Sequence, residues 1–288
     1  MKVKSLIKKV ILPILEGEVK NVYPQIVTLA PNELLKDRTA LITGGTSGIG
    51  FSMAEAFLNA GAKVIITGRS EDKIQIACEQ LKDKNKSYIN RVFGCVLNNI
   101  DIQSFEATFL RILELSQSPI NILVNNAGLV GGEIATVSEE LYDTILDTNL
   151  KGMFFLSKLV GTYMKENGIE GNILNVGSSS CLRPAASAYT LSKWGTRGFT
   201  MGLAKSLAPY GITVNGIAPG PTATPMLGKD PHSDLVFSNP LGRYGLPEEV
   251  ANMAVILVSG IGKSIVGDMV YMTGGSGLIT YDDVDYQF

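Results

Sequence analysis

The sequence predicts one α/β domain built on a doubly wound parallel sheet of about seven strands, with helices on both faces. Short apolar stretches typical of strands alternate with longer stretches of helical periodicity from Lys36 onward. A glycine-rich turn joins the first of these strands to the first of these helices. The chain can also bury one large core, because it has 288 residues of which 45% are apolar.

The first core strand is predicted at Thr39–Ile42, a short apolar stretch between polar residues. The stretch that follows reads Thr43-Gly44-Gly45-Thr46-Ser47-Gly48-Ile49-Gly50, and Ile49, Met53 and Phe57 then have the spacing of one helix face. Glycine at such a turn lets backbone N–H groups approach a phosphate, and the helix N-terminus adds partial positive charge. We therefore predict that a dinucleotide binds here through Gly44, Thr46, Ser47, Gly48, Ile49 and Gly50.

The remaining elements alternate along the chain. Further strands are expected at Lys63–Thr67, Arg91–Cys95, Ile120–Val124, Asn172–Val176, Thr213–Ile217 and Met269–Met272. Helices are expected from Ser70, which can cap the first of them, and over Phe105–Leu115, about Glu139–Lys165, Ser187–Leu207 and Glu248–Val258. Because strands that alternate with helices usually pair in parallel, this order favours a sheet covered on both faces.

Composition and charge exclude several classes of function. The net charge of −2 offers nucleic acid no electrostatic attraction. The single histidine, His232, lies in a polar loop, so multi-histidine metal sites are impossible and we expect no metal. Three widely spaced cysteines, Cys78, Cys95 and Cys181, suit a reducing cytoplasm. No apolar run approaches the roughly 20 residues that a membrane span requires.

In a sheet of this kind, ligands bind beyond the carboxyl ends of the strands. Arg69 follows the second strand, where NAD favours an acid and the 2′-phosphate of NADP favours an arginine, so NADP is preferred to NAD. A solvated surface arginine is the alternative. Asn98 and Asn99 follow the third strand, and Asn125-Asn126-Ala127-Gly128 follows the fourth. These small and amide residues can border an adenine and a ribose.

A candidate proton-transfer pair follows the fifth strand. Tyr189 and Lys193 are four residues apart, so both project from one face of the predicted helix. A tyrosine of ordinary pKa ~10 is a poor base at neutral pH, but a lysine ammonium within ~5 Å favours the phenolate and lowers that pKa. Ser178 lies eleven residues before Tyr189. The Tyr-x-x-x-Lys spacing is common on helix surfaces, so the pair alone does not establish a site.

Taken together, these motifs resemble the short-chain dehydrogenase/reductase family in its plain, non-extended branch. The resemblance is carried, in order, by Thr43–Gly50, Asn125–Gly128, Asn149, Ser178, Tyr189-x-x-x-Lys193 and Pro219-Gly220, followed by Pro240-Leu241-Gly242-Arg243 and Pro247-Glu248-Glu249-Val250. It covers about residues 34–278, and the combination is specific although no single motif is. The chain is similar to 3-oxoacyl-[acyl-carrier-protein] reductases and to sugar or polyol dehydrogenases. The resemblance implies a Rossmann-type domain in a homotetramer.

The resemblance implies a catalytic tetrad of Asn149, Ser178, Tyr189 and Lys193. In the family the serine hydrogen-bonds the substrate oxygen, the tyrosine transfers the proton, and the lysine holds the cofactor ribose and tunes the tyrosine. The asparagine supports a water chain to bulk solvent, and hydride passes directly between nicotinamide and substrate carbon. Because the serine loop is short, Ser179 and Ser180 stay open as alternatives to Ser178.

Further cofactor contacts are implied by the same resemblance. Pro219, Gly220, Thr222 and Thr224 resemble the stretch that touches the nicotinamide carboxamide, and Tyr189 and Lys193 are expected among the cofactor contacts as well. Asn98 departs from the family pattern, in which an aspartate faces the adenine. An amide can still hydrogen-bond at that position.

The sequence therefore predicts an NADP-dependent oxidoreductase, with NAD possible, that transfers hydride to or from a ketone or secondary alcohol. A small free ketone or hydroxyl compound is the favoured substrate, because segments 164–170 and 205–210 carry little positive charge where carrier-dependent relatives tend to be basic. A 3-oxoacyl group on an acyl-carrier protein is the alternative. A non-enzymatic dinucleotide-binding protein in regulation or assembly is a second alternative, which the complete tetrad disfavours.

The two ends of the chain have no counterpart that the resemblance explains. Residues 1–33 begin with apolar residues at helical spacing, among them Leu6, Val10 and Ile14, with lysines between them. We expect an amphipathic helix and arm that packs on the protein or on a sister subunit, with a membrane surface as the alternative. Residues 279–288 are expected to form an acidic tail, which leaves 34–278 as the catalytic domain of a cytoplasmic protein.

Overall fold

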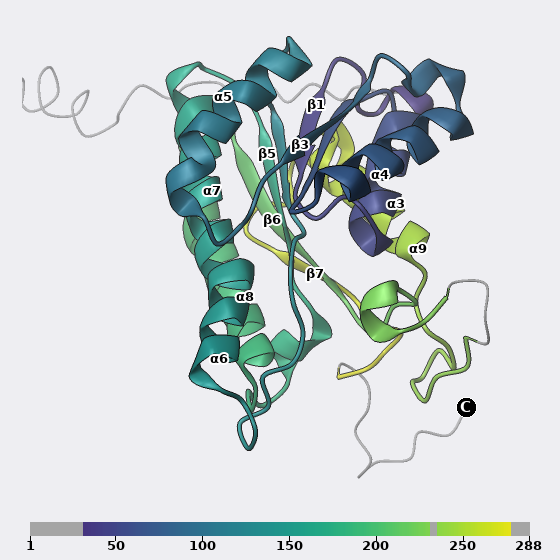
Figure 1. Ribbon diagram of the computed structural model, residues 1–288, viewed down its shortest axis with the longest axis vertical. Helices are drawn as coiled ribbons and strands as arrows, with labels where there is room; N and C mark the ends of the chain where they lie inside the picture. Colours follow the sequence, from purple (N-terminus) through teal and green to yellow (C-terminus); the bar gives the residue numbers. More distant parts are fainter. Residues whose placement is uncertain (1–30, 231–234, 278–288) are drawn as a thin grey trace, which may run out of the picture.

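The structure is a computed structural model that describes residues 31–230 and 235–277. Over these residues, seven parallel strands form one sheet between two layers of helices (Figure 1). The strands are β1 (Thr39–Ile42), β2 (Lys63–Gly68), β3 (Val92–Val96), β4 (Ile122–Asn125), β5 (Asn172–Val176), β6 (Thr213–Pro219) and β7 (Met269–Met272). Their order across the sheet is β3-β2-β1-β4-β5-β6-β7. The predicted fold class is confirmed.

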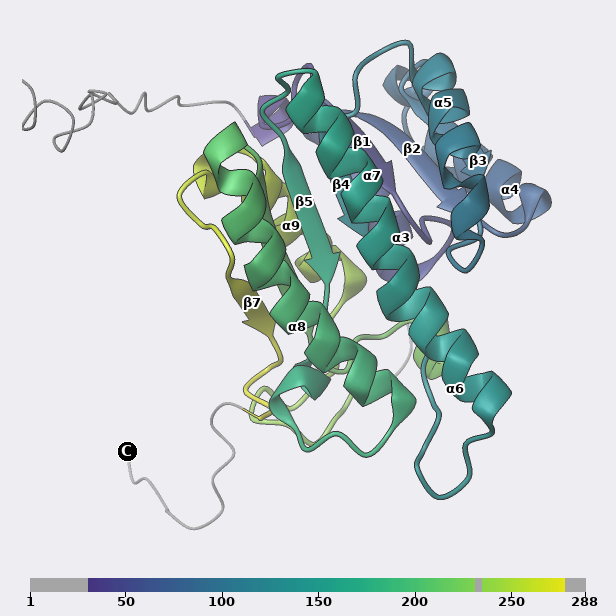
Figure 2. The same ribbon diagram turned by 90° about the vertical axis from the view of Figure 1, so that its left-hand side faces the viewer.

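The helices divide between the two faces of the sheet (Figure 2). One face is covered by α3 (Gly48–Asn59), α4 (Glu71–Lys84) and α9 (Pro247–Val258), and the other by α5 (Phe105–Ser116), α7 (Gly152–Glu166) and α8 (Ala188–Leu207). The short helix α6 (Glu139–Leu146) precedes α7. Short 3₁₀ helices lie at Pro31–Glu33, Lys86–Tyr88, Ile102–Ser104, Ser179–Leu182, Ala208–Tyr210, Pro225–Leu227 and Gly260–Gly262.

Successive side chains of the central strands enter two separate cores. Ile42 of β1 packs with α3, α4 and α9, whereas its neighbour Leu41 packs with α5, α7 and α8. Ile66 and Ile65 of β2 divide in the same way. Because helices cover both faces, these strands are apolar at successive positions and not only at alternate ones. This packing fixes the strand ends from which the loops of the site depart.

In chain order, the sheet grows first to one side of β1 and then to the other. The strands β2 and β3 extend the sheet to one side of β1, and β4 to β7 extend it to the other. The loops that leave β1 and β4 therefore turn toward opposite faces, and a crevice opens between them beyond the carboxyl ends of the strands.

The region expected as one helix over 139–165 is interrupted. A π-helical segment, Asp147–Lys151, separates α6 from α7. A π segment contains one more residue per turn than an α-helix, and such segments are frequent at functional sites. Here it includes Asn149, which is buried. The other predicted bounds agree with the structure within two residues, the largest offsets being the start of β4 and the end of β6.

Three expectations concern residues outside the described part of the chain. These are the amphipathic segment within 1–33, of which only 31–33 are described, the acidic tail 279–288, and the loop that holds His232. Among the residues that the structure does describe, none of the helices combines the length and the apolar character that crossing a bilayer requires.

Candidate active site

A cleft of about 990 Å³ opens beyond the carboxyl ends of the strands. The segments that follow β1 to β6 all contribute to its wall. Of the residues expected at the site, those that line it are Gly44, Thr46, Ser47, Gly48, Ile49, Gly50, Arg69, Asn98, Asn99, Ala127, Gly128, Ser178, Tyr189, Lys193, Pro219, Gly220, Thr222 and Thr224. Asn125 and Asn149 are not part of the wall.

The glycine-rich turn is held tightly against the loop that follows β4. Asn126 donates from Nδ2 to the carbonyl oxygens of Thr43 (2.9 Å) and Gly44 (3.0 Å). A Cβ on Gly50 would collide with the Gly44 carbonyl oxygen, and a Cβ on Gly44, whose φ is +64°, would lie 2.9 Å from Ala127 Cα. Both positions therefore require glycine, because a larger residue at Gly44 would push the turn away from the loop after β4 and one at Gly50 would distort the turn itself.

The start of α3 offers backbone N–H groups to an anion. The N-cap residue Ser47 is extended and its side chain makes no capping hydrogen bond. The N–H groups of the first helical turn thus keep free hydrogen-bonding capacity beside the cleft, where the helix dipole also favours negative charge. This cradle of glycines and N–H groups fits the pyrophosphate of a dinucleotide.

Positive charge lies at one end of the cleft, where β2 leads into α4. Arg69 and Lys73 both line the cleft there, and Ser70 caps α4 by accepting a hydrogen bond from the Lys73 backbone N–H at 3.4 Å. No ion pair is found for either cation among the described residues. Lys73 was absent from the sequence-based expectation, although it follows Arg69 by one helical turn.

The expected role of Asn125 as a cofactor contact does not match its position. Its Nδ2 donates to Ser157 Oγ and to Asn175 Oδ1, each at 2.9 Å, inside the protein. Asn125 is the last residue of β4, and successive strand residues point to opposite sides. The next residue, Asn126, lines the cleft in its place.

Tyr189 and Lys193 lie in the first turns of α8, whose N-cap Ser187 accepts a hydrogen bond from the Thr190 backbone N–H at 3.1 Å. Lys193 Nζ lies 5.6 Å from the centroid of the Tyr189 ring, as their spacing of four residues leads one to expect. The same Nζ donates to the Val176 carbonyl oxygen at 2.8 Å. The end of β5 therefore holds the lysine against the tyrosine.

Burial governs the pKa values of this pair. It lowers the pKa of the Lys193 ammonium from 10.5 to about 8. It also raises the pKa of the Tyr189 hydroxyl, an effect that the hydrogen bond with Ser178 opposes. This differs from the expectation of a lowered Tyr189 pKa, because burial of the hydroxyl is the largest influence on it. Tyr189 is therefore protonated at neutral pH and suited to donate a proton.

The short serine segment after β5 presents one serine to the cleft. Ser178 lines the cleft and caps the following 3₁₀ turn by accepting from the Ser180 backbone N–H at 3.1 Å. Ser179 and Ser180, the alternatives from sequence, are not part of the wall. Cys181 donates from Sγ to the Ser178 carbonyl oxygen at 2.8 Å, and this hydrogen bond helps to hold the segment in place.

Asn149 joins three segments of the site behind its wall. Its Oδ1 accepts from the Leu129 backbone N–H (2.7 Å), and its Nδ2 donates to Leu129 O (2.8 Å) and to Ser192 Oγ (3.0 Å). Ser192 in turn donates to the Tyr189 carbonyl oxygen at 2.6 Å. Asn149 and Ser192 are both buried. The sequence contains Ser192 between Tyr189 and Lys193, but nothing in the pattern marked it as the link between Asn149 and the tyrosine.

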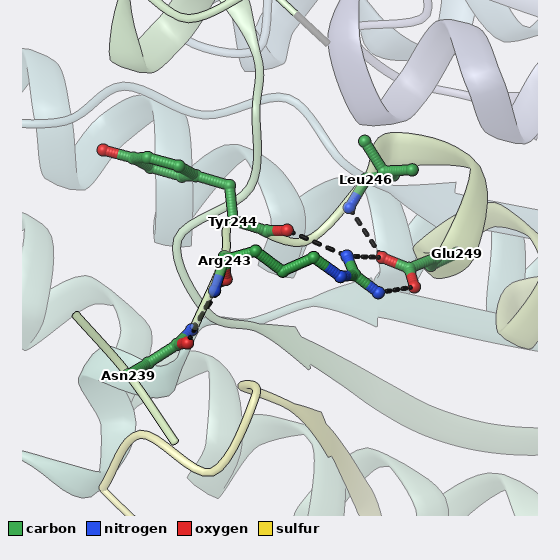
Figure 3. Close-up of polar contacts among 5 residues, drawn as sticks. All are labelled: Asn239, Arg243, Tyr244, Leu246 and Glu249. Carbon is green, nitrogen blue, oxygen red and sulfur yellow. Dashed lines mark hydrogen bonds and ion pairs between the residues drawn. The ribbon is translucent and has the colours of Figure 1, made fainter. Parts of the chain in front are cut away.

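Polar contacts among its own residues and with α9 hold the loop before α9 in place (Figure 3). Arg243 forms a two-pronged ion pair with Glu249 at 2.7 and 3.0 Å, and Glu249 also accepts from the Leu246 backbone N–H at 2.8 Å (Figure 3). The neighbouring Gly245 accepts a hydrogen bond from Ala223 N at 2.9 Å. This hydrogen bond links the loop to the segment that carries Thr222 and Thr224.

Comparison with known proteins identifies the relatives of this chain. A family model described as short chain dehydrogenase matches residues 38–234. The 3-oxoacyl-[acyl-carrier-protein] reductase of Aquifex aeolicus is 34% identical, over 84% of this chain and 98% of that protein. The 3alpha-hydroxysteroid dehydrogenase of Mediterraneibacter gnavus is 32% identical over the same shares. The crystal structure of a variant actinorhodin polyketide ketoreductase with NADPH superposes with a TM-score of 0.75 at 31% identity, over 84% of this chain and 98% of that one.

Proposed function

The chain belongs to the short-chain dehydrogenase family, whose members are oxidoreductases of CH–OH and ketone groups, and we propose how its own residues carry out that reaction. The observation that carries the proposal is that Ser178, Tyr189 and Lys193 line the same cleft as the glycine-rich turn. A dinucleotide bound at the turn and a ketone bound at Tyr189 would then share one cleft.

We propose NADP as the preferred cofactor, with NAD as the alternative. The backbone N–H groups at the start of α3 hold the pyrophosphate, and Arg69 with Lys73 holds the 2′-phosphate. The polyketide ketoreductase structure that resembles this chain contains NADPH, which supports the choice. Asn98, Asn99, Ala127 and Gly128 border the adenosine, and Pro219, Gly220, Thr222 and Thr224 border the nicotinamide.

Tyr189 acts as the general acid when a ketone is reduced. When bound, the nicotinamide cofactor supplies the hydride in reduction and accepts it in oxidation. Because its pKa is raised, Tyr189 carries the proton that the carbonyl oxygen receives. Ser178 donates a hydrogen bond to the same oxygen, which stabilises the negative charge that develops there. In oxidation Tyr189 takes the alcohol proton instead.

Lys193 and Asn149 keep the tyrosine in position. Lys193, fixed by the Val176 carbonyl, is the positive group nearest the Tyr189 ring in the cleft wall and is placed to bind the ribose. Both amide hydrogens of Asn149 are used within the protein, by Leu129 and Ser192. Its side chain therefore holds the turn of α8 that carries Tyr189, and the water chain implied by the family would have to use other groups of this segment.

The proposed substrate is a small free ketone or the corresponding alcohol. The end of α7 and the end of α8 carry little positive charge for docking an acidic carrier, and Lys165 there lies over the Tyr210 ring at 4.6 Å. A 3-oxoacyl group on acyl-carrier protein is the second candidate, favoured by the similarity to the Aquifex aeolicus reductase. The test compares kcat/KM for a 3-oxoacyl group on its carrier and on a short thioester. A hundredfold higher kcat/KM for the carrier-bound substrate, with a preference that falls as salt concentration rises, would reverse the order of the two candidates.

We further propose a cytoplasmic homo-oligomer, and a tetramer as the family resemblance implies. The adjoining helices α7 and α8 expose large apolar side chains, namely Phe154, Phe155, Leu191, Trp194 and Met201. Gly198 and Gly202 on α8 have open space where a Cβ would lie, which allows close approach of another helix. Sedimentation velocity with Met201→Glu tests this, since a charge in a subunit interface would shift the protein to smaller species.

The experiment that tests the function is hydride transfer from NADPH to a panel of free ketones, followed by loss of NADPH absorbance. We expect turnover that requires Tyr189 and is faster with NADPH than with NADH. Tight NADPH binding without turnover of any ketone or of a 3-oxoacyl substrate would instead support the non-enzymatic alternative.

A further inference from the structure

Two apolar segments belong to the wall of the cleft that contains Tyr189. Leu129 and Val130 form the first, and Pro225, Met226 and Leu227 form the second. Val130, Met226 and Leu227 keep 41%, 52% and 46% of their surface exposed to solvent. Large apolar side chains left exposed inside a cleft indicate a ligand whose surface is apolar at the same place.

The first apolar segment is fixed directly to the turn that carries Tyr189. The Tyr189 backbone N–H donates to Gly131 O at 3.3 Å, and the Ala188 N–H donates to Gly132 O at 2.9 Å. Farther along, the Ile134 N–H donates to Ala186 O at 3.0 Å. Ile134 is 78% exposed, so the apolar surface that begins at Val130 continues outward from the site.

The second apolar segment forms the 3₁₀ turn Pro225–Leu227, which lies over the glycine-rich turn. A Cβ on Gly48 would lie 3.4 Å from Thr224 Cγ2 and 3.9 Å from Pro225 Cδ. The turn is closed by hydrogen bonds to Thr224 O from the backbone N–H groups of Leu227 (3.0 Å) and Lys229 (3.1 Å). These apolar side chains thus stand on an ordered turn of the cleft wall, directly after Thr224 and beside the glycine-rich turn.

Polar groups beside Tyr189 and in the segment before this turn are largely engaged within the protein. Lys193 Nζ donates to Val176 O, Thr222 Oγ1 donates to Gly220 O (3.0 Å), and Thr224 Oγ1 donates to Thr222 O (3.3 Å). The exposed cations of the cleft, Arg69 and Lys73, lie at its other end. A substrate with many hydroxyl groups would lose hydrogen bonds to water here without replacing them, which disfavours its binding.

From this lining we infer that the substrate bears an apolar chain or ring beside its carbonyl group, and that Val130, Met226 and Leu227 select it over polyhydroxylated ketones. The inference rests on the proposed ketone reduction at Tyr189 and adds the chemical class of the substrate. It applies equally to a free ketone and to an acyl chain, but it excludes sugars and polyols.

A chain-length series tests the inference. The full-length protein with NADPH is given methyl ketones of four to eight carbons, with dihydroxyacetone as the polar counterpart. Because each buried methylene changes binding by up to about fourfold, we expect kcat/KM to rise roughly two- to fourfold per methylene until the chain leaves the apolar wall. A flat series, or dihydroxyacetone preferred to the longest ketone, would overturn the inference while leaving ketone reduction intact.

A matched pair of variants tests whether Leu227 of the cleft wall causes the rise of kcat/KM with chain length. Leu227→Gln places a polar side chain of similar size in the cleft, and Leu110→Gln makes the same change on the exposed surface of α5, outside the cleft. We expect Leu227→Gln to reduce the increase per methylene to less than twofold and Leu110→Gln to leave it unchanged. An unchanged series in Leu227→Gln would contradict the role given to that residue.

Binding measured apart from turnover separates this inference from the proposed function. With NADPH present an alcohol cannot be oxidised, so calorimetry with alkan-2-ols of the same lengths, and with sorbitol, reports binding alone. Tighter binding of the longer alkanols without reduction of any ketone would support the apolar site and refute ketone reduction. Absence of both length-dependent binding and turnover would overturn both.

Discussion

The two ends of the cleft are built in opposite ways. At the nucleotide end, the glycine-rich turn offers backbone N–H groups, and the cation that follows β2, Arg69, is exposed. At the proposed catalytic end, Asn149, Ser178 and Lys193 are 3%, 8% and 6% exposed and are tied to neighbouring segments by hydrogen bonds. One end thus depends on backbone and surface charge, and the other on buried polar side chains.

This difference teaches which properties of the enzyme can be changed separately. An exposed charge contributes to ligand binding and little to folding, so the cofactor choice that we propose for Arg69 should be independent of stability. A buried ionisable group is coupled to the core, so a change at Lys193 alters activity and stability together. The comparison leads to four predictions, ordered by the size of the expected effect.

The largest effect is expected at the proton donor. Tyr189→Phe removes the hydroxyl and keeps the ring, so kcat should fall by about 10²–10⁴-fold, the usual contribution of a general acid. Cofactor affinity and melting temperature should hardly change. Tyr142→Phe, which removes an exposed hydroxyl on α6, is the control and should match the wild type. If Tyr189→Phe kept more than a few per cent of kcat, another group would be the donor.

Lys193→Met should change activity and stability together at the buried end. The folded-state pKa of about 8 lies below the unfolded value of 10.5, so the unfolded chain binds more protons between these pH values and wild-type stability rises with pH across them. Burial of the charged Lys193 ammonium therefore lowers the free energy of unfolding by about 3 kcal/mol, and this cost is present in full below about pH 8.

Methionine removes that cost, but the Val176 carbonyl then lacks its hydrogen-bond donor. The missing hydrogen bond lowers the free energy of unfolding by about 1 kcal/mol. We therefore expect Lys193→Met to be inactive, weaker in cofactor binding, and more stable than wild type by about 2 kcal/mol near neutral pH. Urea unfolding of the two proteins on either side of this pH window measures it. A variant less stable than wild type near neutral pH would show that the buried ammonium is fully compensated.

At the exposed end, Arg69→Asp should change cofactor choice without changing stability. Loss of a charge-assisted contact to phosphate is worth roughly 1.5–3 kcal/mol, so the KM for NADPH should rise at least tenfold while that for NADH changes little. Arg111→Asp on the exposed side of α5 carries the same change in net charge and should alter neither KM. Equal use of both cofactors by the wild type, unaltered in Arg69→Asp, would refute the assignment.

The smallest effect is expected for Ser192→Ala. Removing one hydrogen bond to Asn149 and one to the Tyr189 carbonyl should lower kcat by roughly two- to tenfold, the equivalent of about 0.5–1.5 kcal/mol, with KM for NADPH unchanged. Thr196→Val removes a buried hydroxyl one turn later that bonds only the Ser192 carbonyl in the described structure, and it serves as the control. Since Ser192 acts through Asn149, the substitution should have a smaller effect in an Asn149→Ala background than alone.

The fold and the location of the cleft were predictable because they follow from local patterns. Apolar stretches such as Ile120–Val124 predict strands, and the spacing of apolar residues after Gly50 predicts a helix. The alternation of the two implies a parallel sheet. The Tyr189–Lys193 pair was equally local, since a spacing of four on a helix brings two side chains together whatever the rest of the chain does.

The amino-acid sequence by itself thus determined the sheet, the glycine-rich turn, the order of the motifs and the chemical types available at the strand ends. Only the tertiary structure decided that Asn125 points inward, that Ser178 is the serine at the cleft, and that Asn149 bonds Leu129 and Ser192, which are 20 and 43 residues away in the chain. It also decided that burial raises the Tyr189 pKa. The reason is physical: hydrogen-bond partners and desolvation depend on which distant segments pack together, and no pattern within one segment contains that information.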